Sequence, residues 1–372
     1  MLIFLYILCI CFNLVLSFKR YLYPLNRLKN KSFYSILFPT FIFIYILLAG
    51  YRNNSGLSGD MNNLQFEYNY FLRTGLTIYE GGYKLFMIFG KMLNLDFFTW
   101  RSFVIFIALS LIIASILKYS SNPHFVVALY LLFLIIPSAE QLRNFLALSF
   151  LQLGLSQYYY DKHSKFKKNI TLLILILIAG SIHSLFLSYL VILIFNNLSN
   201  KQIKIISTLV LLFCVLIFIN NNHIPGFSII SSYFSESRIS NYLNQQIRYG
   251  FLLFMSLHLI SIILLSYINN LNINSTPSSP ISKIFYLNYS LVFFFPLLMV
   301  DGTFIRIFRN ILLINYFSYA DFLEENRYHS KKFIFVIILV FGTLLWVYLL
   351  YFIANKPFSL YYPFFTDNII FN

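Results

Sequence analysis

Long apolar runs separated by short polar segments make up most of this chain. A helix needs roughly 20 apolar residues to cross a bilayer, and shorter ones are tolerated inside a bundle, so these runs predict transmembrane helices. The regular runs are 2–16, 33–50, 101–117, 124–137, 144–160, 203–219, 249–268, 284–300, 304–320 and 333–353.

Two further runs are less regular. Residues 81–95 contain Lys84 and Lys91, which predicts an interfacial or re-entrant segment rather than a span. Residues 169–195 are too long for one simple span and contain Gly180 and His183. We therefore expect two short helices that meet near His183, which brings the total to about twelve crossings.

Composition supports the same class of protein. Of 372 residues, 59% are hydrophobic and only 10% are charged, and the mean hydropathy is +0.75. Soluble domains carry about a quarter charged residues, so lipid must cover most of this surface. The chain is therefore predicted to be an all-α polytopic membrane protein with a single transmembrane domain over residues 1–372. Its first run is followed by Lys19 and Arg20 instead of a cleavage site, which indicates an uncleaved span.

Lysine and arginine in short loops predict the orientation, because such loops stay cytoplasmic. The loop 17–32 contains both residue types and the loop 161–168 contains four lysines, so both loops are assigned to the cytoplasm. Both termini then lie outside, as do the outer loops 51–100 and 220–248 and the short connections 138–143, 180–183 and 301–303. This rule also explains the net charge of +15 without nucleic acid as a partner.

Several arginines fall on the outer side, against that rule. Arg52, Arg143, Arg306 and Arg309 lie outside or near the outer ends of spans. The guanidinium group offers a fixed fork of donors that matches phosphate oxygens. The group therefore predicts an anionic ligand presented from outside, although any single member could snorkel to headgroups or pair with a nearby carboxylate, as Arg143 could with Glu140.

The outer side also carries candidate proton-transfer groups. Asp60 follows Gly56 and Gly59 just beyond a span and could instead cap a helix. Glu80 precedes two glycines and could simply favour a helix dipole. His183 lies in a very apolar stretch, where a neutral histidine bonded to a carbonyl is the alternative to a ligand or proton-transfer role. The cysteines lie inside apolar runs, so we expect no metal site, cofactor or disulfide.

Taken in order, these motifs resemble the EpsG/Wzy family of bacterial exopolysaccharide, capsule and O-antigen polymerases. The matching pieces are Tyr51-Arg52 through Gly59-Asp60, Glu80-Gly-Gly-Tyr83, Gln141-Leu-Arg143-Asn-Phe-Leu-Ala147, the span around His183 and the Arg306/Arg309 pair. The resemblance covers roughly residues 40–320, and Asn144 stands where the family often has glutamine.

The resemblance implies a glycosyltransferase with GT-C-like architecture in the cytoplasmic membrane, active on its outer face. Such a polymerase joins oligosaccharide repeat units carried on undecaprenyl pyrophosphate, with membrane lipid and a chain-length regulator as further partners. In our hypothesis the pyrophosphate is bound, without a metal ion, by Arg52, Arg143, Arg306 and Arg309. Asp60, Glu80 and His183 are then the candidates to act on the acceptor hydroxyl.

Three alternatives stay open. A GT-C transferase with a monosaccharyl lipid donor, or a ligase for finished glycan, shares the donor chemistry, and Asp60 suits the acidic residue in the first outer loop of many such enzymes. A flippase or other transporter is disfavoured, because the sequence shows no internal repeat and its cations gather at one face. A non-catalytic assembly partner predicts that no single outward arginine is essential.

Overall fold

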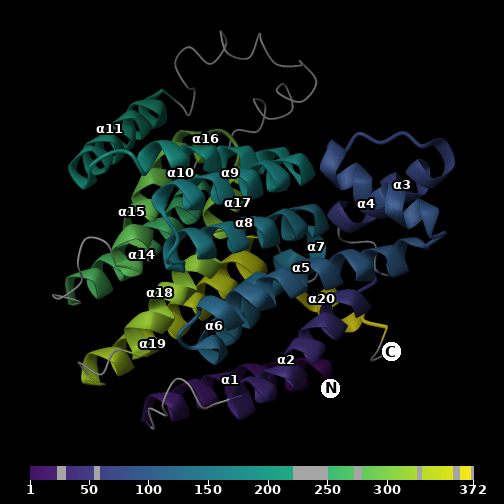
Figure 1. Cartoon of the computed structure of the whole chain (residues 1–372), viewed down its shortest axis with the longest axis horizontal. Helices are drawn as coiled ribbons and strands as arrows, with labels where there is room; N and C mark the ends of the chain where they lie inside the picture. The colour runs from purple at the N-terminus through teal and green to yellow at the C-terminus, as the bar shows by residue number, and fades with distance from the viewer. Residues whose placement is uncertain are drawn as a thin grey trace. The chain divides into compact units, whose positions relative to one another are not determined.

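The computed structural model describes residues 1–22, 31–53, 59–220, 250–271, 279–324, 329–354 and 361–369 (Figure 1). This part of the chain is helical, and its β pairing is confined to an isolated antiparallel bridge between Tyr51 and Asn368. The predicted all-α class is confirmed. The chain divides into two compact units, one formed by Met1–Leu187 with Tyr319–Asn372 and the other by Ser188–Ser318.

The first unit contains most of the helices. In chain order they are α1 (Leu2–Leu22), α2 (Lys31–Gly50), α3 (Gly59–Thr74), α4 (Gly81–Met92), α5 (Phe97–Tyr119), α6 (Pro123–Leu129), the π turn η1 (Tyr130–Leu134), α7 (Ile135–Glu140), α8 (Leu142–Tyr160), α9 (Lys165–Ile182), α19 (His329–Val347), the π turn η5 (Tyr348–Ala354) and α20 (Tyr361–Thr366). The 3-10 helix η2 (Ser184–Tyr189) and α18 (Leu312–Glu324) each cross the boundary between the units.

The second unit contains α10 (Leu190–Phe195), α11 (Asn200–Ile219), α14 (Gly250–Leu271), α15 (Pro280–Leu291), η3 (Val292–Phe294), α16 (Phe295–Val300), η4 (Gly302–Phe304) and α17 (Ile305–Arg309). A buried polar network connects three of its elements. His258 on α14 forms a hydrogen bond of 2.8 Å with the backbone carbonyl of Asn288 on α15. The side-chain amides of Asn288 and Asn315 form two hydrogen bonds with each other, of 2.8 and 3.0 Å. These bonds satisfy groups that would be costly to leave unpaired in an apolar interior.

Among the residues that the structure describes, six helices are long and apolar enough to cross a membrane. They span Phe97–Tyr119, Pro123–Glu140, Asn200–Ile219, Gly250–Leu271, Pro280–Met299 and Lys331–Phe352, and shorter apolar helices span Leu2–Phe18, Leu37–Gly50 and Ser184–Phe195. A polytopic membrane protein is therefore confirmed, while the number of twelve crossings and the GT-C-like architecture stay predictions. The single transmembrane domain over residues 1–372 also stays a prediction.

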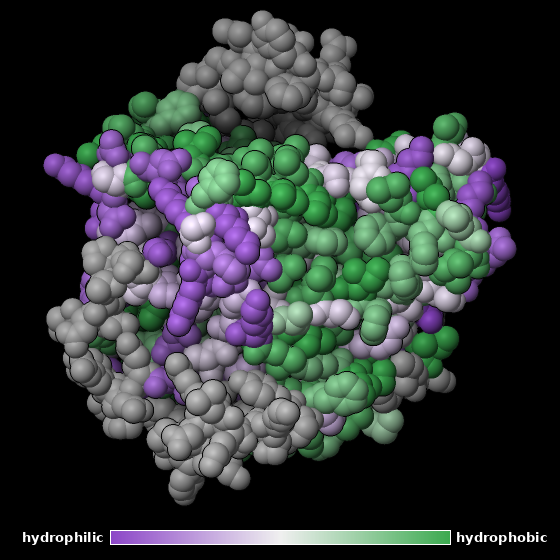
Figure 2. All heavy atoms as spheres, in the orientation of Figure 1, coloured by the Kyte–Doolittle hydropathy of each residue, from purple (hydrophilic) through white to green (hydrophobic). Residues whose placement is uncertain are grey.

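The predicted span 144–160 corresponds to α8, which is not among those six helices. It buries Asn144, Ser149, Gln152 and Ser156. Its polar side chains are therefore covered by protein rather than lipid. On the face shown in Figure 2, apolar side chains cover the middle of the region where α5, α8 and α9 lie, and hydrophilic side chains gather at its left-hand end.

The predicted break in residues 169–195 is confirmed. Helix α9 ends at Ile182, His183 adopts an extended conformation with φ −149°, and the 3-10 helix η2 follows. Gly180 lies close to the side chain of Leu187 on η2: a Cβ atom at this position would lie 2.4 Å from its Cδ2 atom, so a larger residue would require that side chain to move.

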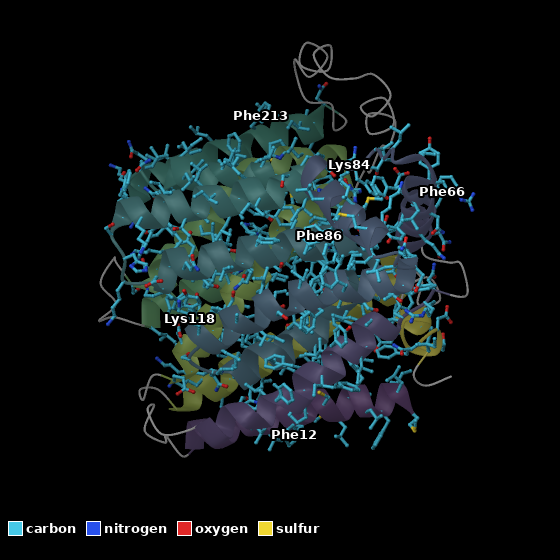
Figure 3. All side chains as sticks on the ribbon, turned by 45° about the vertical axis from the view of Figure 1, so that its right-hand side comes forward. Phe12, Phe66, Lys84, Phe86, Lys118 and Phe213 are labelled. Atoms are coloured by element: carbon cyan, nitrogen blue, oxygen red, sulfur yellow. The ribbon has the colours of Figure 1, made fainter. Side chains whose placement is uncertain are left out.

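The segment 51–100 forms two helices, α3 and α4, that pack against the start of α5 (Figure 1). Tyr68 on α3 stacks on Trp100 with ring centroids 4.3 Å apart, and Tyr83 on α4 meets the same ring edge-on at 5.7 Å. Figure 3 shows Lys84 on α4 and Lys118 in the last turn of α5 at opposite ends of this unit. The outer position and interfacial character of this segment stay predictions, and the outer loop 220–248 lies almost wholly outside the described residues.

The end of the chain returns to the end of α2. The side chain of Asn368 donates to the carbonyl of Leu47 at 3.0 Å, and the backbone N–H of Ile369 donates to the carbonyl of Gly50 at 3.0 Å. The N–H of Arg52 donates to the carbonyl of Asp367 at 2.8 Å. These bonds satisfy carbonyls at a helix end that have no partner within the helix, and they place the C-terminal residues beside Tyr51 and Arg52.

Candidate functional site

Arg143 and Glu80 form an ion pair in the first unit. Helix α8 begins at Leu142, so Arg143 lies in its first turn, where the helix dipole disfavours a cation. Its Nη1 atom lies 2.9 Å from Oε2 of Glu80, and both side chains are about three-quarters buried (28% and 24% exposed). Among the described residues, this contact replaces the local pair with Glu140 that the sequence allowed.

The other oxygen of Glu80 binds the helix break. Oε1 accepts hydrogen bonds from the backbone N–H of Ser184 at 3.1 Å and from its hydroxyl at 3.0 Å. Partial burial pushes the pKa of Glu80 upward, but the bonds from Ser184 and the charge of Arg143 outweigh it and bring that pKa below its ordinary value. Glu80 is therefore an ionised group that connects the start of α8 to the turn after α9.

Gly82 makes this connection sterically feasible. A Cβ atom at position 82 would lie 2.8 Å from the backbone carbon and oxygen of Ser181 at the end of α9. Helix α4 thus approaches α9 so closely that only glycine fits. At the neighbouring Gly81 a Cβ atom would have no neighbour within 4 Å. The two glycines after Glu80 therefore have different physical roles.

Tyr79 completes what we call the Glu80 cluster, which consists of Tyr79, Glu80, Arg143 and Ser184. The guanidinium carbon of Arg143 lies 4.0 Å from the centroid of the Tyr79 ring, a cation–π contact. Burial raises the pKa of Tyr79, Arg143 lowers it, and the charges of Glu67, Asp60 and Glu80 raise it further. Stacking on one side and an ion pair on the other fix the orientation of the Arg143 guanidinium.

Asp60 is close enough to influence Tyr79 electrostatically but is itself exposed. It is the second residue of α3, which begins at Gly59, so it lies inside the first turn and not at the cap position before the helix. A carboxylate there is favoured by the positive end of the helix.

His183 adjoins the Glu80 cluster, immediately before Ser184. Its Nδ1 atom accepts a hydrogen bond from the backbone N–H of Leu185 at 3.3 Å, and its ring meets Phe186 edge-on with centroids 6.0 Å apart. Because a backbone N–H can only donate, Nδ1 must carry a lone pair, and the proton of the neutral ring lies on Nε2. In this state Nε2 is a donor rather than a base.

A second group, which we call the Arg101 cluster, consists of Tyr51, Arg101 and Glu140 and is almost fully buried. Arg101 donates from Nη1 to the carbonyls of Leu48 at 2.9 Å and Tyr51 at 3.2 Å, and from Nη2 to the carbonyl of Ala139 at 2.9 Å. It thereby binds carbonyls at the ends of both α2 and α7.

The Tyr51 hydroxyl donates to Oε1 of Glu140 at 2.5 Å. Burial and the Glu140 carboxylate raise the pKa of Tyr51, so its phenol keeps its proton and remains a donor. Glu140 supplies a negative charge near the buried Arg101 guanidinium, which reduces the cost of burying that cation.

Arg52 follows directly on Tyr51. Its Nη1 atom donates to the carbonyl of Ala49 at 2.8 Å, and its guanidinium lies 4.3 Å above the ring centroid of Phe98. Partial burial lowers the pKa of Arg52, and the carboxylate of Asp96 partly offsets this. Arg52 is half-buried and held by protein groups on two sides.

Arg306 and Arg309 belong to the second unit. The sequence predicted them at the start of a span, but they lie in the last turn of the short helix α17, after the 3-10 helix η4. Arg309 is buried and Arg306 is half-buried. Nearby, the Tyr189 hydroxyl donates to the carbonyl of Ile307 at 2.6 Å. A cation at this end of a helix is favoured by the dipole, unlike Arg143 at the start of α8.

The structure thus brings together three segments that the orientation argument assigned to one side of the membrane. Glu80 comes from 51–100, Arg143 from the connection near 138–143, and Ser184 follows the turn at 180–183. Sequence reasoning did not select Tyr79, Ser184, Tyr51, Arg101 or Glu140 as site residues. Glu140 was visible as a charge between two apolar runs, but nothing in the sequence indicated that it lies beside Tyr51 rather than Arg143.

Within the described residues, no three His, Cys, Asp or Glu side chains are grouped as a bound metal ion would require. Comparisons with curated proteins and with solved structures give no match. The model of the EpsG family matches residues 35–366, which is nearly the whole chain and includes every segment of both polar clusters. This multi-pass membrane protein therefore belongs to the EpsG family.

Proposed function

We propose that this protein is a polysaccharide polymerase that joins oligosaccharide repeat units carried on undecaprenyl pyrophosphate, on the outer side of the cytoplasmic membrane. The family suggests a polymerase of the glycosyltransferase type. The observation that carries the finer proposal is the Arg143 guanidinium, which is fixed between Glu80 and the ring of Tyr79.

This arrangement suits departure of a pyrophosphate group. When the glycosyl–phosphate bond breaks, negative charge accumulates on the leaving group, and a cation that is already oriented stabilises that charge without reorganising. Arg143 is held in this way before any substrate arrives. Arg52, Arg306 and Arg309 are proposed as further pyrophosphate ligands on the basis of charge and the fork geometry of arginine.

The three predicted proton-transfer residues receive different proposed roles. A carboxylate whose pKa is lowered is a weaker base, so Glu80 is less suited to accept the hydroxyl proton. Its proposed role is to position the guanidinium group of Arg143. His183, with Nδ1 occupied, fits a hydrogen-bond donor to a phosphate or sugar oxygen. Asp60 is exposed and fits a hydrogen-bonding ligand for the acceptor sugar.

A ligase or a GT-C transferase with another lipid-linked donor would use the same donor chemistry and is the nearest alternative. A flippase is the alternative of a different class. A flippase would not need an arginine preorganised by an ion pair and an aromatic ring, since it breaks no glycosyl bond. The contacts of Arg143 therefore favour an enzyme.

The test is a deletion strain complemented with wild type, Arg143→Ala or Arg143→Lys, with lipid-linked saccharides resolved by size and the protein level in the membrane measured in parallel. Arg73→Ala is the matched control, because Arg73 is an exposed arginine in the last turn of α3. We expect wild type and Arg73→Ala to give long chains. Both Arg143 variants should accumulate single repeat units outside the membrane.

Two results would refute the proposal. Units trapped on the cytoplasmic side of the deletion strain would indicate a flippase. Full polymer output from Arg143→Lys would show that the guanidinium fork is not required, because lysine keeps the charge but not the paired donors.

A further inference from the structure

Asp301 has an unusual environment in the second unit. It lies between α16 and the 3-10 helix η4 and is only 1% exposed. Its Oδ1 atom accepts a hydrogen bond from the backbone N–H of Thr303 at 2.7 Å, which fixes the plane of the carboxyl group. Its Oδ2 atom is buried and has no hydrogen-bond partner among the described residues.

Asp301 lies only a few residues before Arg306 and Arg309 in the sequence. In the described part of the chain its hydrogen bond is instead to its own helix turn, and no ion pair with either arginine is formed there. A buried carboxyl oxygen without a hydrogen-bond donor is unfavourable. Such groups are rare in folded proteins, and a catalytic role or a bound water or ion explains many of them.

We propose that Asp301 Oδ2 binds the acceptor sugar hydroxyl and acts as its general base. This inference rests on the proposed polymerase function. A hydroxyl supplies the donor that Oδ2 lacks, and a carboxylate fixed through its other oxygen cannot rotate away from that donor. Asp301 also lies in the connection 301–303, which the orientation argument assigns to the outer side.

The chemistry balances without another reagent. The hydroxyl oxygen of the acceptor sugar forms a bond to the anomeric carbon of the donor sugar. The bond from that carbon to the pyrophosphate oxygen breaks, and its electron pair leaves with the lipid pyrophosphate. The hydroxyl proton moves to Asp301 Oδ2, which later releases it to water.

The Asp301→Asn variant separates this role from a structural one. The side-chain oxygen of asparagine still accepts the hydrogen bond from the Thr303 N–H. An uncharged NH2 group then stands in place of Oδ2 and cannot take a proton. Asp301→Ser is a second variant that can also cap the turn. Asp161→Asn is the matched control, because both oxygens of Asp161 already have partners: the Lys162 N–H at 2.8 Å, and the Tyr119 hydroxyl and His163 ring at 3.5 Å.

The assay uses purified protein in proteoliposomes, with lipid-linked repeat units extracted from the deletion strain as substrate. Removing a general base should lower the rate about 10²–10⁴-fold. Binding of undecaprenyl pyrophosphate alone should be unchanged.

Each other outcome is decisive. Wild-type rates in Asp301→Asn would show that a water molecule satisfies Oδ2 and would overturn the inference while leaving the proposed function intact. Loss of both variants from the membrane would assign Asp301 a structural role and would also overturn it. If wild type does not polymerise the extracted units, the proposed function fails together with this inference.

Discussion

Arg143 Nη1 and Glu80 Oε2 lie 2.9 Å apart although 63 positions separate them in the sequence. Arg143 occupies the first turn of α8, and Glu80 caps the start of α4, so the pair joins two helix beginnings. Anions are favoured at such ends and cations are not. The carboxylate therefore makes it feasible to keep an arginine where the helix alone would reject one.

Replacing Glu80 by glutamine should reduce polymer output by up to about 100-fold, because a small displacement of a catalytic group has effects of this size. Glutamine removes the charge that pairs with Arg143 but can still accept hydrogen bonds from Ser184. The measurement is the size distribution of lipid-linked saccharide at equal protein level. The comparison variant is Glu67→Gln, since Glu67 bonds Thr77 and Ile78 instead of an arginine. Equal loss in both variants would contradict a specific role for Glu80.

The ion pair also predicts how stability depends on pH. The pKa of Glu80 in the folded protein lies below its ordinary value of 4.5, so its stabilising effect is present above about pH 4.5 and disappears as pH falls through the lowered value. Thermal unfolding of wild type and Glu80→Gln in detergent should therefore differ at pH 7 and converge near pH 3. A difference that grows on acidification would show that the pKa is raised instead.

Alanine at position 82 should be far more harmful than alanine at position 81. The added methyl group at Gly82 would collide with the backbone of Ser181 and force α4 away from α9, which would break the bonds between Glu80 and Ser184. At Gly81 the methyl group has open space. Both variants are made in the same helix turn and compared for membrane level and polymer output. Similar results for the two would argue against the close approach.

Removing the Arg101 guanidinium should destabilise the first unit strongly. Arg101→Met leaves the carbonyls of Leu48 and Ala139 without donors and Glu140 without a nearby cation. Breaking a buried charge pair costs about 3–5 kcal/mol. Unfolding in a denaturant or by heat measures this loss, and the exposed Arg73→Ala should change stability by no more than about 0.5 kcal/mol. Wild-type stability of Arg101→Met would contradict the assignment.

Much of the helical pattern could be predicted because lipid imposes it. The apolar runs and the break near His183 follow from hydropathy. Loop charge assigned the segments 51–100, 138–143 and 180–183 to one side of the membrane, but it did not predict which of their residues meet. The ends of α2, α8 and α11 lie within three residues of the predicted bounds, whereas α1 extends to Leu22 and the predicted span 304–320 is divided into α17 and α18. Helix α8 was found from its apolar positions although its polar side chains are buried by neighbouring helices.

The partners of individual polar residues could not be predicted in this way. Glu140 and Arg143 are neighbours in sequence, but one faces Tyr51 and the other Glu80, because α7 ends between them and the chain changes direction at Gln141. Asp301 is close to Arg306 and Arg309 in sequence, but it caps its own turn instead of pairing with them. Such choices depend on tertiary geometry, which hydrophobic periodicity does not encode.

The bond from Asn368 to Leu47 joins positions 321 residues apart, and it has a consequence for biosynthesis. The end of α2, with Tyr51 and Arg52 attached, receives its last hydrogen-bond partners only after almost the entire chain has been translated. A chain that stalls or is cut before position 361 contains every arginine proposed to bind pyrophosphate but lacks those partners. A chain without those residues therefore leaves carbonyls at the end of α2 unpaired next to Tyr51 and Arg52.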